Sequence, residues 1–580
     1  MKKLYSIISA GLVFVMVLTG CGVSEQITIQ RPEDGWYGAA EHQSVSYETI
    51  RGHTFDESKL LSSLEELSQT IREDGSEEWV LALYQTILSE TDSLGTAMTL
   101  ADIEYNANVQ DEAASEKRIA LTEQYHRLMD QIYPILKDAL APPYGGALEA
   151  EMLKVTTQDE IDQIKNYKVK SEEELALILR EQELTQQYDL TMQQEFEVTV
   201  DGEKWTAEKL QTSPPDDMTQ NYKINKALQD ARTEAIGELL RELLQVRTEL
   251  AKAQGYDNYS DYAYKELYNR DYTVKDIEKV YASVKKYFVP FYKQVQDSSA
   301  EIDWSILSNS KKESEEELLQ RLAPYMEKID PELAQSFDLL RESGTYDMAN
   351  KKGKNSFSFA TKLYSYDIPF LFLSPVGYAQ DSTVLIHEFG HWNTMLHSKQ
   401  PMLFEGKNHD VAEINSQGLE LLFLEYADEM WGEGADAIRY NTIMKLCSSV
   451  IEGCLYDEFQ NALYANPDMT TDEMSELYQK LCKEYGLTGK GQDDWIYVAH
   501  TFSFPLYYIS YATSGLSSLD LYTETFENRE QAVNRYMALS AIGMTGSYCD
   551  SIQKVGLKDI FDAGSVNAIV KGLKTAMDLK

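Results

Sequence analysis

The chain has 580 residues, and its 95 Asp and Glu outweigh its 53 Lys and Arg to give a formal net charge of −42 at pH 7. This charge disfavours nucleic acids and acidic partners, because the chain has no basic face with which to neutralise phosphates. Five cysteines are too few for a disulfide framework, whereas the length is sufficient for an ample hydrophobic core.

Residues 1–20 have the pattern of an export signal. A basic start is followed by an apolar run from Leu4 to Leu18, which is too short for a spanning helix. Leu-Thr-Gly-Cys at the end of this run resembles a bacterial lipobox. It implies that Cys21 is lipidated and anchors the exported protein to the outer face of the bacterial cell membrane. The alternative is a plain secretory signal in which Cys21 is incidental. Residues 21–48 are polar with Gly and Pro, and we expect them to form a membrane-proximal linker.

Helical spacing dominates most of the remaining chain. From about residue 55, Leu60, Leu64, Leu67 and Ile71 recur at intervals of three and four, as on one face of a helix. No linker-like break follows residue 48, so we expect a single, mostly helical unit from 49 to 580.

Two interruptions of this helical pattern are predicted in the first half of the chain. Residues 196–206 alternate around Asp201-Gly202, which is typical of a β-hairpin. Pro290 should end or bend the helix that precedes it.

A third interruption has strand character. Residues 356–360 alternate, and residues 369–373 form a short apolar run. An exposed strand edge here could bind an extended peptide through backbone hydrogen bonds. Gly377 would allow the following loop to lie close to the bound peptide.

The run His387-Glu388-Phe389-Gly390-His391 carries the predicted chemistry. Two histidines four residues apart lie one turn above each other on a helix, so both imidazoles can bind one zinc ion. Glu388 would lie beside the metal, where a carboxylate can take a proton from a zinc-bound water. The alternative is a surface helix with solvated His and Glu. Apolar residues around the motif instead predict a buried helix in which the histidines need a partner.

A catalytic zinc site also needs a third protein ligand. Residues 409–420 are predicted to begin a second helix, in which Asp410 precedes Glu413 by three residues in the manner of a capping box. We take Glu413 as the third ligand. His409 is the second choice, because it lies nearer to a loop.

These segments resemble the thimet oligopeptidase and oligoendopeptidase F family of zinc peptidases. In that family, His-Glu-Phe/Leu-Gly-His is followed some two dozen residues later by Val-Glu or Ala-Glu on a helix, often with Ser-Gln after it. Residues 412–417, Ala-Glu-Ile-Asn-Ser-Gln, fit this pattern. The resemblance implies His387, His391 and Glu413 as ligands of one Zn²⁺ per chain and Glu388 as general base. Thr394 is a departure, because relatives often have a further histidine there.

His500 and the tyrosines after it extend the resemblance. The family carries a similar histidine followed by closely spaced tyrosines that donate hydrogen bonds to the scissile carbonyl and the oxyanion. The resemblance implies these roles for His500, Tyr508 and Tyr511. Tyr507 competes with Tyr508, because the spacing from the histidine can differ by one residue from that of relatives. Without the motif, packing would be the simplest role for tyrosines.

The resemblance further implies a mostly α, two-lobed peptidase with a deep substrate channel and a small β-sheet next to the H-E-x-x-H helix. Residues 49–250 would form mainly the N-terminal helical lobe, and residues 251–580 the catalytic region. The implied activity is that of a gluzincin-type zinc endopeptidase, which hydrolyses internal bonds of oligopeptides outside the cytoplasm with a zinc-bound water as nucleophile. We expect a monomer.

Two other functions stay open. One is an exopeptidase resembling the zinc dipeptidyl carboxypeptidases, which would need a cationic residue to hold the C-terminal carboxylate of its substrate. The other is a non-catalytic peptide-binding lipoprotein.

Overall fold

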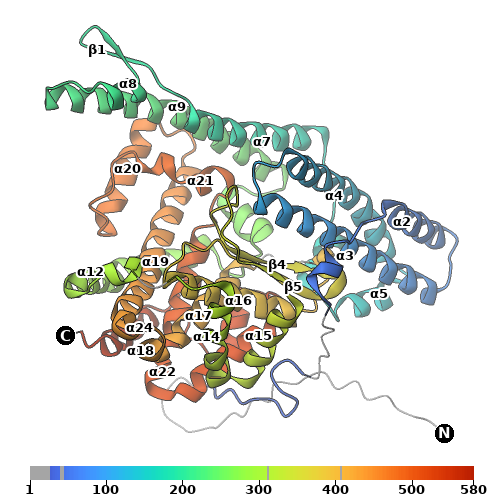
Figure 1. Ribbon diagram of the computed structural model, residues 1–580. Coiled ribbons are helices and arrows are strands. Elements are labelled where there is room, and N and C mark those ends of the chain that lie inside the picture. The colour runs from blue at the N-terminus through green and yellow to red at the C-terminus, as the bar shows by residue number, and fades with distance from the viewer. Residues whose placement is uncertain (1–26, 39–44, 310–311, 405–407, 580) are drawn as a thin grey trace.

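The computed structural model describes residues 27–38, 45–309, 312–404 and 408–579. Figure 1 shows a predominantly helical molecule in which a small sheet lies among the helices, as predicted. The predicted export signal and the lipidation site at Cys21 lie outside the described residues. Across the part of the chain that the structure describes, no helix combines the length and the apolarity needed to cross a membrane.

The first long helices form a lobe with a hydrophobic core of its own. α2 (Glu57–Arg72) begins after Asp56, whose carboxylate accepts a hydrogen bond from the N–H of Ser58. Leu60, Leu64 and Leu67 of this helix are buried, as their spacing predicts. The other helices of this lobe are α3 (Glu77–Ala107), α4 (Glu112–Ala139), α5 (Gly145–Met152) and α6 (Gln158–Lys165).

Two long helices, α7 (Glu172–Gln193) and α9 (Met218–Ala253), pack side by side next to this lobe (Figure 1). The predicted hairpin lies between them in sequence, with β1 (Val198–Val200) antiparallel to β2 (Glu203–Trp205). Asp201 and Gly202 at its tip have φ angles of 51° and 84°, the left-handed values that a two-residue hairpin turn requires. The short α8 (Ala207–Thr212) leads into α9.

The largest hydrophobic core unites most of the remaining helices with α9. Before the sheet these are α10 (Tyr259–Tyr262), α11 (Val274–Ser283), α12 (Val289–Ser298), α13 (Ser305–Asn309), α14 (Glu315–Ile329) and α15 (Pro331–Ser343). After the sheet they are α16 (Gln380–His397), α17 (His409–Phe423), α18 (Ala427–Trp431), α19 (Ala435–Ala465), α20 (Thr471–Glu484), α21 (Ala499–Ser503), α22 (Ile509–Ile542), α23 (Tyr548–Lys554) and α24 (Ala563–Ala576).

The segment 27–38 also packs against this large core. We expected this segment to belong to a linker. Instead, Ile29 and Trp36 are buried, and Arg31 forms an ion pair with Asp330 at 2.9 Å. Burial of these two apolar side chains and the ion pair of Arg31 help to hold an otherwise polar segment against the body of the protein. The short α1 (Tyr47–Ile50) follows.

Pro290 lies at a change of helical geometry, as predicted. α11 continues into a π-helical turn, Val284–Phe288, and α12 begins directly after it with Pro290 in its first turn. Proline is tolerated best at this position, because the first N–H groups of a helix have no intrahelical partner.

A three-stranded sheet packs against α16. Its strand order is β3 (Tyr346–Asp347), β5 (Ile368–Phe372) and β4 (Phe359–Leu363), and β4 is antiparallel to β5. β5 is buried along its whole length, which accounts for its continuous apolar sequence. The indole N–H of Trp392 on α16 donates to the carbonyl of Pro369 at 2.9 Å and joins the helix to the sheet. The small sheet next to the H-E-x-x-H helix is therefore confirmed.

Candidate metal centre

His387 and His391 lie one turn apart on α16, with ring centroids 5.0 Å apart and ring planes at 80°. Leu385, Ile386 and Phe389 around them are buried, so packing on several sides fixes the orientation of the helix. The prediction of a buried helix is confirmed.

The second helix of the site, α17, crosses α16 at Gly390. A Cβ atom at this position would lie 2.6 Å from the carbonyl oxygen of Asn415 and 2.7 Å from the Cα of Ser416. Only glycine allows the two backbones to approach this closely. The crossing brings Glu413 of α17 to the two histidines.

Glu413 converges with both imidazoles. Its Oε2 lies 3.5 Å from Nε2 of His387 and 3.7 Å from Nε2 of His391. Among the described residues, these three are the one group of His, Cys, Asp and Glu whose ligand atoms gather closely, all within 4.8 Å of one another. His409, our second choice of ligand, is not in the group.

The donor set fits a zinc ion. Bonds of about 2.0–2.1 Å at tetrahedral angles place neighbouring ligand atoms about 3.4 Å apart, close to the two distances found. The side chains of His387, His391 and Glu413 keep 26%, 15% and 18% exposure, so the group is not closed off from solvent. Three protein ligands with access for a fourth, non-protein ligand are typical of a catalytic site rather than a structural one.

Glu420 fixes the ring orientation of His387. Nδ1 of His387 donates to Oε1 of Glu420 at 2.7 Å, so Nε2 is the ring nitrogen that faces Glu413. Burial lowers the pKa of His387, but the hydrogen bond to Glu420 and the charges of Glu420, Glu413 and Glu388 outweigh burial and raise it to about 10. The imidazole thus lies in a strongly negative environment, which favours a cation.

Glu388 lies beside this group with no partner for one of its oxygens. Its side chain is almost fully buried, and Oε2 has no hydrogen-bond partner among the described residues. Burial raises the pKa of Glu388 to about 7. A carboxylate with this pKa exchanges protons readily near neutral pH.

His500 on α21 lies among three tyrosines. Its ring centroid is 5.7 Å from that of Tyr507, 4.8 Å from that of Tyr508 and 6.3 Å from that of Tyr511. The four predicted positions therefore form one cluster. Burial lowers the pKa of His500, which favours the neutral imidazole.

The tyrosines differ in their relation to Glu413. Burial raises the pKa values of Tyr507 and Tyr511, and the negative charge of Glu413 raises both further. The pKa of Tyr508 is raised to about 12 by burial and then by Tyr456 and Glu452 on α19. The charge of Glu413 thus acts on Tyr507 and Tyr511 but not on Tyr508, which favours Tyr507 over Tyr508.

The predicted capping box at the start of α17 is wrong. The N-cap residue is Asn408, and its side chain makes no capping hydrogen bond. Asp410 is buried, where it accepts a hydrogen bond from Tyr272 at 2.7 Å and forms an ion pair with Arg270 at 3.3 Å. A buried arginine outcompeted the local backbone N–H groups for this carboxylate.

Glu420 was missed by sequence reasoning, although a signal was present. It lies seven residues after Glu413 on the same helix, which places both carboxylates on one face, two turns apart. A carboxylate at that spacing from a metal ligand is a natural partner for the second nitrogen of a ligating histidine.

A helical body, an H-E-x-x-H helix and a carboxylate from the next helix define a metallopeptidase. Residues 334–569, which hold all of these side chains, match the sequence model for Peptidase family M3. No curated protein gives a significant match.

Solved structures share the fold over nearly the whole chain. A candidate oligoendopeptidase F is 22% identical with a TM-score of 0.69 and covers 93% of this chain and 98% of its own. PZ peptidase A, solved with an inhibitor, is 20% identical with a TM-score of 0.69 and covers 93% and 99%. A candidate oligoendopeptidase F from Bacillus anthracis str. Ames is 19% identical with a TM-score of 0.67 and covers 93% and 97%.

Proposed function

We propose that the protein is a zinc-dependent endopeptidase that hydrolyses internal peptide bonds of oligopeptides outside the cytoplasm. The observation that carries this proposal is the convergence of His387, His391 and Glu413 beside the unpaired carboxylate oxygen of Glu388. A non-catalytic binder would have no need of a buried, unpartnered carboxylate at this point, because such a group costs stability.

The donor set favours zinc. Two imidazole nitrogens and one carboxylate oxygen are the ligands of many catalytic zinc sites. When bound, zinc supplies a Lewis acid that polarises the peptide carbonyl and makes water a stronger nucleophile. Glu420 holds the His387 ring so that Nε2 remains available to the cation.

Glu388 is the proposed general base. Its free Oε2 can accept the proton of the attacking water, and its pKa of about 7 suits a group that must also release this proton. The protonated carboxyl then transfers the proton to the leaving amine. Both transfers require only the one side chain.

The tyrosine cluster supplies hydrogen-bond donors. Burial raises the pKa values of Tyr507 and Tyr511, so both hydroxyls stay protonated at neutral pH and can donate to the developing oxyanion. His500 would bind substrate nearby. Tyr508 remains a candidate for the same role.

The contacts of the nearby cations favour an endopeptidase over the carboxypeptidase-like alternative. Arg247 and Arg270 are fully buried and pair with Glu181 and Asp410, and Lys490 pairs with Glu452 at 3.5 Å. Each of these three cations already has an acidic partner within the protein.

The edge strand β4 is the proposed peptide-binding edge. Oγ1 of Thr99 on α3 donates to the carbonyl of Lys362 at 3.0 Å, which covers one end of this edge. At the start of α16, the carboxylate of Asp381 accepts the N–H of Gly377 at 2.7 Å and holds the adjacent loop. Substrates in which single residues are replaced by proline should identify the amides that pair with β4, and equal cleavage of all of them would contradict this part.

The sequence supports two further parts of the proposal. The lipobox-like end of the export signal favours lipidation at Cys21 and attachment to the outer face of the cell membrane. Metabolic labelling with a fatty acid, compared between the wild type and Cys21→Ala, tests this anchor. Gel filtration tests the expected monomer.

A digest of a mixed peptide library by the wild type and by Glu388→Gln, analysed by mass spectrometry, tests the proposed function. Internal cuts that disappear in the variant, while its zinc content stays at that of the wild type, support it. Stepwise removal from one end would support the exopeptidase, and an intact library would support the binder.

A further inference from the structure

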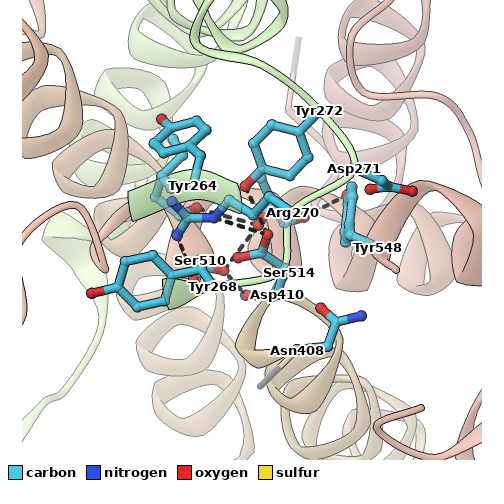
Figure 2. A network of polar contacts seen from close by, with 12 residues as sticks. Tyr264, Tyr268, Arg270, Asp271, Tyr272, Asn408, Asp410, Ser510, Ser514 and Tyr548 are labelled. Carbon is cyan, nitrogen blue, oxygen red and sulfur yellow. Dashed lines mark hydrogen bonds and ion pairs between the residues drawn. The ribbon is translucent and has the colours of Figure 1, made fainter. Parts of the chain in front are cut away.

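Figure 2 shows a network of polar contacts around Arg270, beyond the metal ligands. Arg270 lies in the short connection before α11, and its side chain is completely buried. The preceding residue, Asn269, has a φ of 47°, a left-handed conformation that non-glycine residues rarely adopt. The backbone conformation of Asn269 therefore costs free energy at the point where Arg270 enters the core. The contacts of Arg270 must offset this cost.

The guanidinium of Arg270 contacts two helices of the active site. Nε forms an ion pair with Oδ2 of Asp410 on α17 at 3.3 Å, and Nη2 donates to Oγ of Ser510 on α22 at 3.1 Å. Asp410 lies one turn before Glu413, and Ser510 directly precedes Tyr511. One planar group therefore joins the helix of the carboxylate ligand to the helix of the tyrosine.

Aromatic residues hold this guanidinium in place. The rings of Tyr264 and Tyr268 each lie 4.5 Å from its Cζ, and the hydroxyl of Tyr272 donates to Oδ2 of Asp410 at 2.7 Å. Tyr268 also donates to the carbonyl of Pro505 at 2.8 Å, just before the tyrosines of the site. The arginine has little freedom to move, so the spacing it sets is rigid.

Pairing of α17 with α22 does not require these charges. Gly418 of α17 lies so close to α22 that a Cβ atom would be 3.2 Å from the ring of Tyr536 and 3.3 Å from Leu521. A buried ion pair contributes little net stability compared with apolar residues of similar volume. Unlike apolar packing, the ion pair fixes the direction in which each of its two side chains points.

We propose that Arg270 and Asp410 are positioning residues that set the distance between Glu413 and the hydroxyl of Tyr511. This inference rests on the proposed function. The ion pair with Asp410 orients the metal ligand Glu413, and the hydrogen bond from Arg270 to Ser510 orients the hydroxyl of Tyr511. The two contacts can therefore be separated by experiment.

The test is a double variant, Arg270→Met with Asp410→Leu, which removes both charges of the ion pair from the core. We expect a melting temperature within a few degrees of the wild type, zinc affinity reduced about tenfold or more in a chelator competition, and kcat reduced about 100-fold with little change in KM. Arg535→Met with Glu524→Leu is the matched control, because this ion pair of 2.7 Å is also mostly buried but bridges the kink of α22 at Asn528, well beyond Ser510 and Tyr511 in the helix. The control should keep wild-type zinc affinity and kcat.

Wild-type zinc affinity and kcat in the folded double variant would overturn the inference. Should that variant not fold, two single variants carry the test. Tyr272→Phe should weaken zinc binding severalfold, and Ser510→Ala should lower kcat severalfold at unchanged zinc affinity. No change in either of these two variants would equally overturn it. A wild type that binds zinc but cleaves no peptide would contradict the proposed function alone, because the zinc readout still tests the contact with Asp410.

Discussion

The metal-binding helices and the tyrosine segment are held in place by different kinds of contact. α16 and α17 meet backbone to backbone at Gly390, so their crossing depends on the absence of a side chain. The segment that carries His500 and Tyr507 is held by side chains from distant elements. Arg247 donates to the carbonyls of Thr501 and Phe502, and the amide of Leu506 donates to Gln460.

The tyrosine segment contains a strained backbone position. Leu506 is fully buried with a φ of 63°, a conformation that costs about 1–3 kcal/mol for a residue of this kind. The surrounding hydrogen bonds must hold it there. Metal binding should therefore be sensitive to steric changes at the helix crossing, whereas kcat should be sensitive to loss of remote hydrogen-bond donors.

The largest effect is expected at the tyrosines. Tyr507→Phe and Tyr511→Phe should each lower kcat by about 10²–10³, the usual cost of removing one donor to an oxyanion. Tyr508→Phe should cost less, because its ring packs against Tyr456, with centroids 4.9 Å apart, and its pKa shows no influence of Glu413. Steady-state kinetics at matched zinc content will distinguish them. A greater loss in Tyr508→Phe than in Tyr507→Phe would reverse our ordering.

At the helix crossing, we expect Gly390→Ala to lower activity by about 100-fold. The added methyl group lies 2.6 Å from a backbone oxygen, so the helices must separate and Glu413 must move relative to the histidines. Zinc affinity should fall together with kcat. Gly146→Ala on α5 is the control, because its Cβ would meet nothing within 4 Å and should slightly stabilise the helix. Equal zinc affinity in both variants would show that the crossing tolerates a side chain.

Glu420→Gln tests the hydrogen bond behind His387. Loss of the carboxylate should weaken zinc binding by about 10–100-fold, because the ring loses its charged partner at 2.7 Å. Chelator competition measures this affinity. An unchanged value would mean that α16 alone orients the histidine.

Arg247→Lys tests the side-chain hydrogen bonds that hold the tyrosine segment. Arg247 pairs with Glu181 at 2.6 Å and donates to three oxygens beyond it, which a single ammonium group cannot replace. We expect kcat to fall about tenfold at unchanged zinc affinity. Arg180→Lys, at an exposed ion pair, should leave both quantities unchanged. A loss of zinc affinity in Arg247→Lys would show that the contacts of Arg247 also support the metal ligands.

The same contrast accounts for what sequence could predict. The spacing of Leu60, Leu64 and Leu67, the Asp201-Gly202 turn and the paired histidines are local patterns, and local geometry alone determines their meaning. Glu413 could be predicted as a ligand because it lies on the helix that directly follows the H-E-x-x-H helix in the chain.

Contacts between residues far apart in the sequence could not be predicted. Arg247 and Thr501 are 254 residues apart, and periodicity shows which face of a helix is buried but not what it meets. Asp410 illustrates the resulting error. Its local pattern indicates a helix cap, whereas a guanidinium 140 residues earlier in the chain determines where the carboxylate points.

The smallest effect concerns the link between the metal-binding helices and the N-terminal lobe. Asp92 on α3 accepts a hydrogen bond from the N–H of Met402, in the chain between α16 and α17, at 2.8 Å. Burial raises the pKa of Asp92 to about 6. Because this value lies above the unfolded value of about 3.9, ionisation costs the folded state free energy. The cost is absent below about pH 4 and complete above about pH 6.

Asp92→Asn should remove this dependence while keeping an acceptor for Met402. The wild type should therefore lose about 1–2 kcal/mol of unfolding free energy relative to the variant as the pH rises from 4 to 6. Urea denaturation of both proteins across this range measures the difference, in which contributions from other titrating groups cancel. A difference that stays constant with pH would mean that Asp92 is hydrated in the folded protein. The anchor of the α16–α17 connection would then be weaker than its burial indicates.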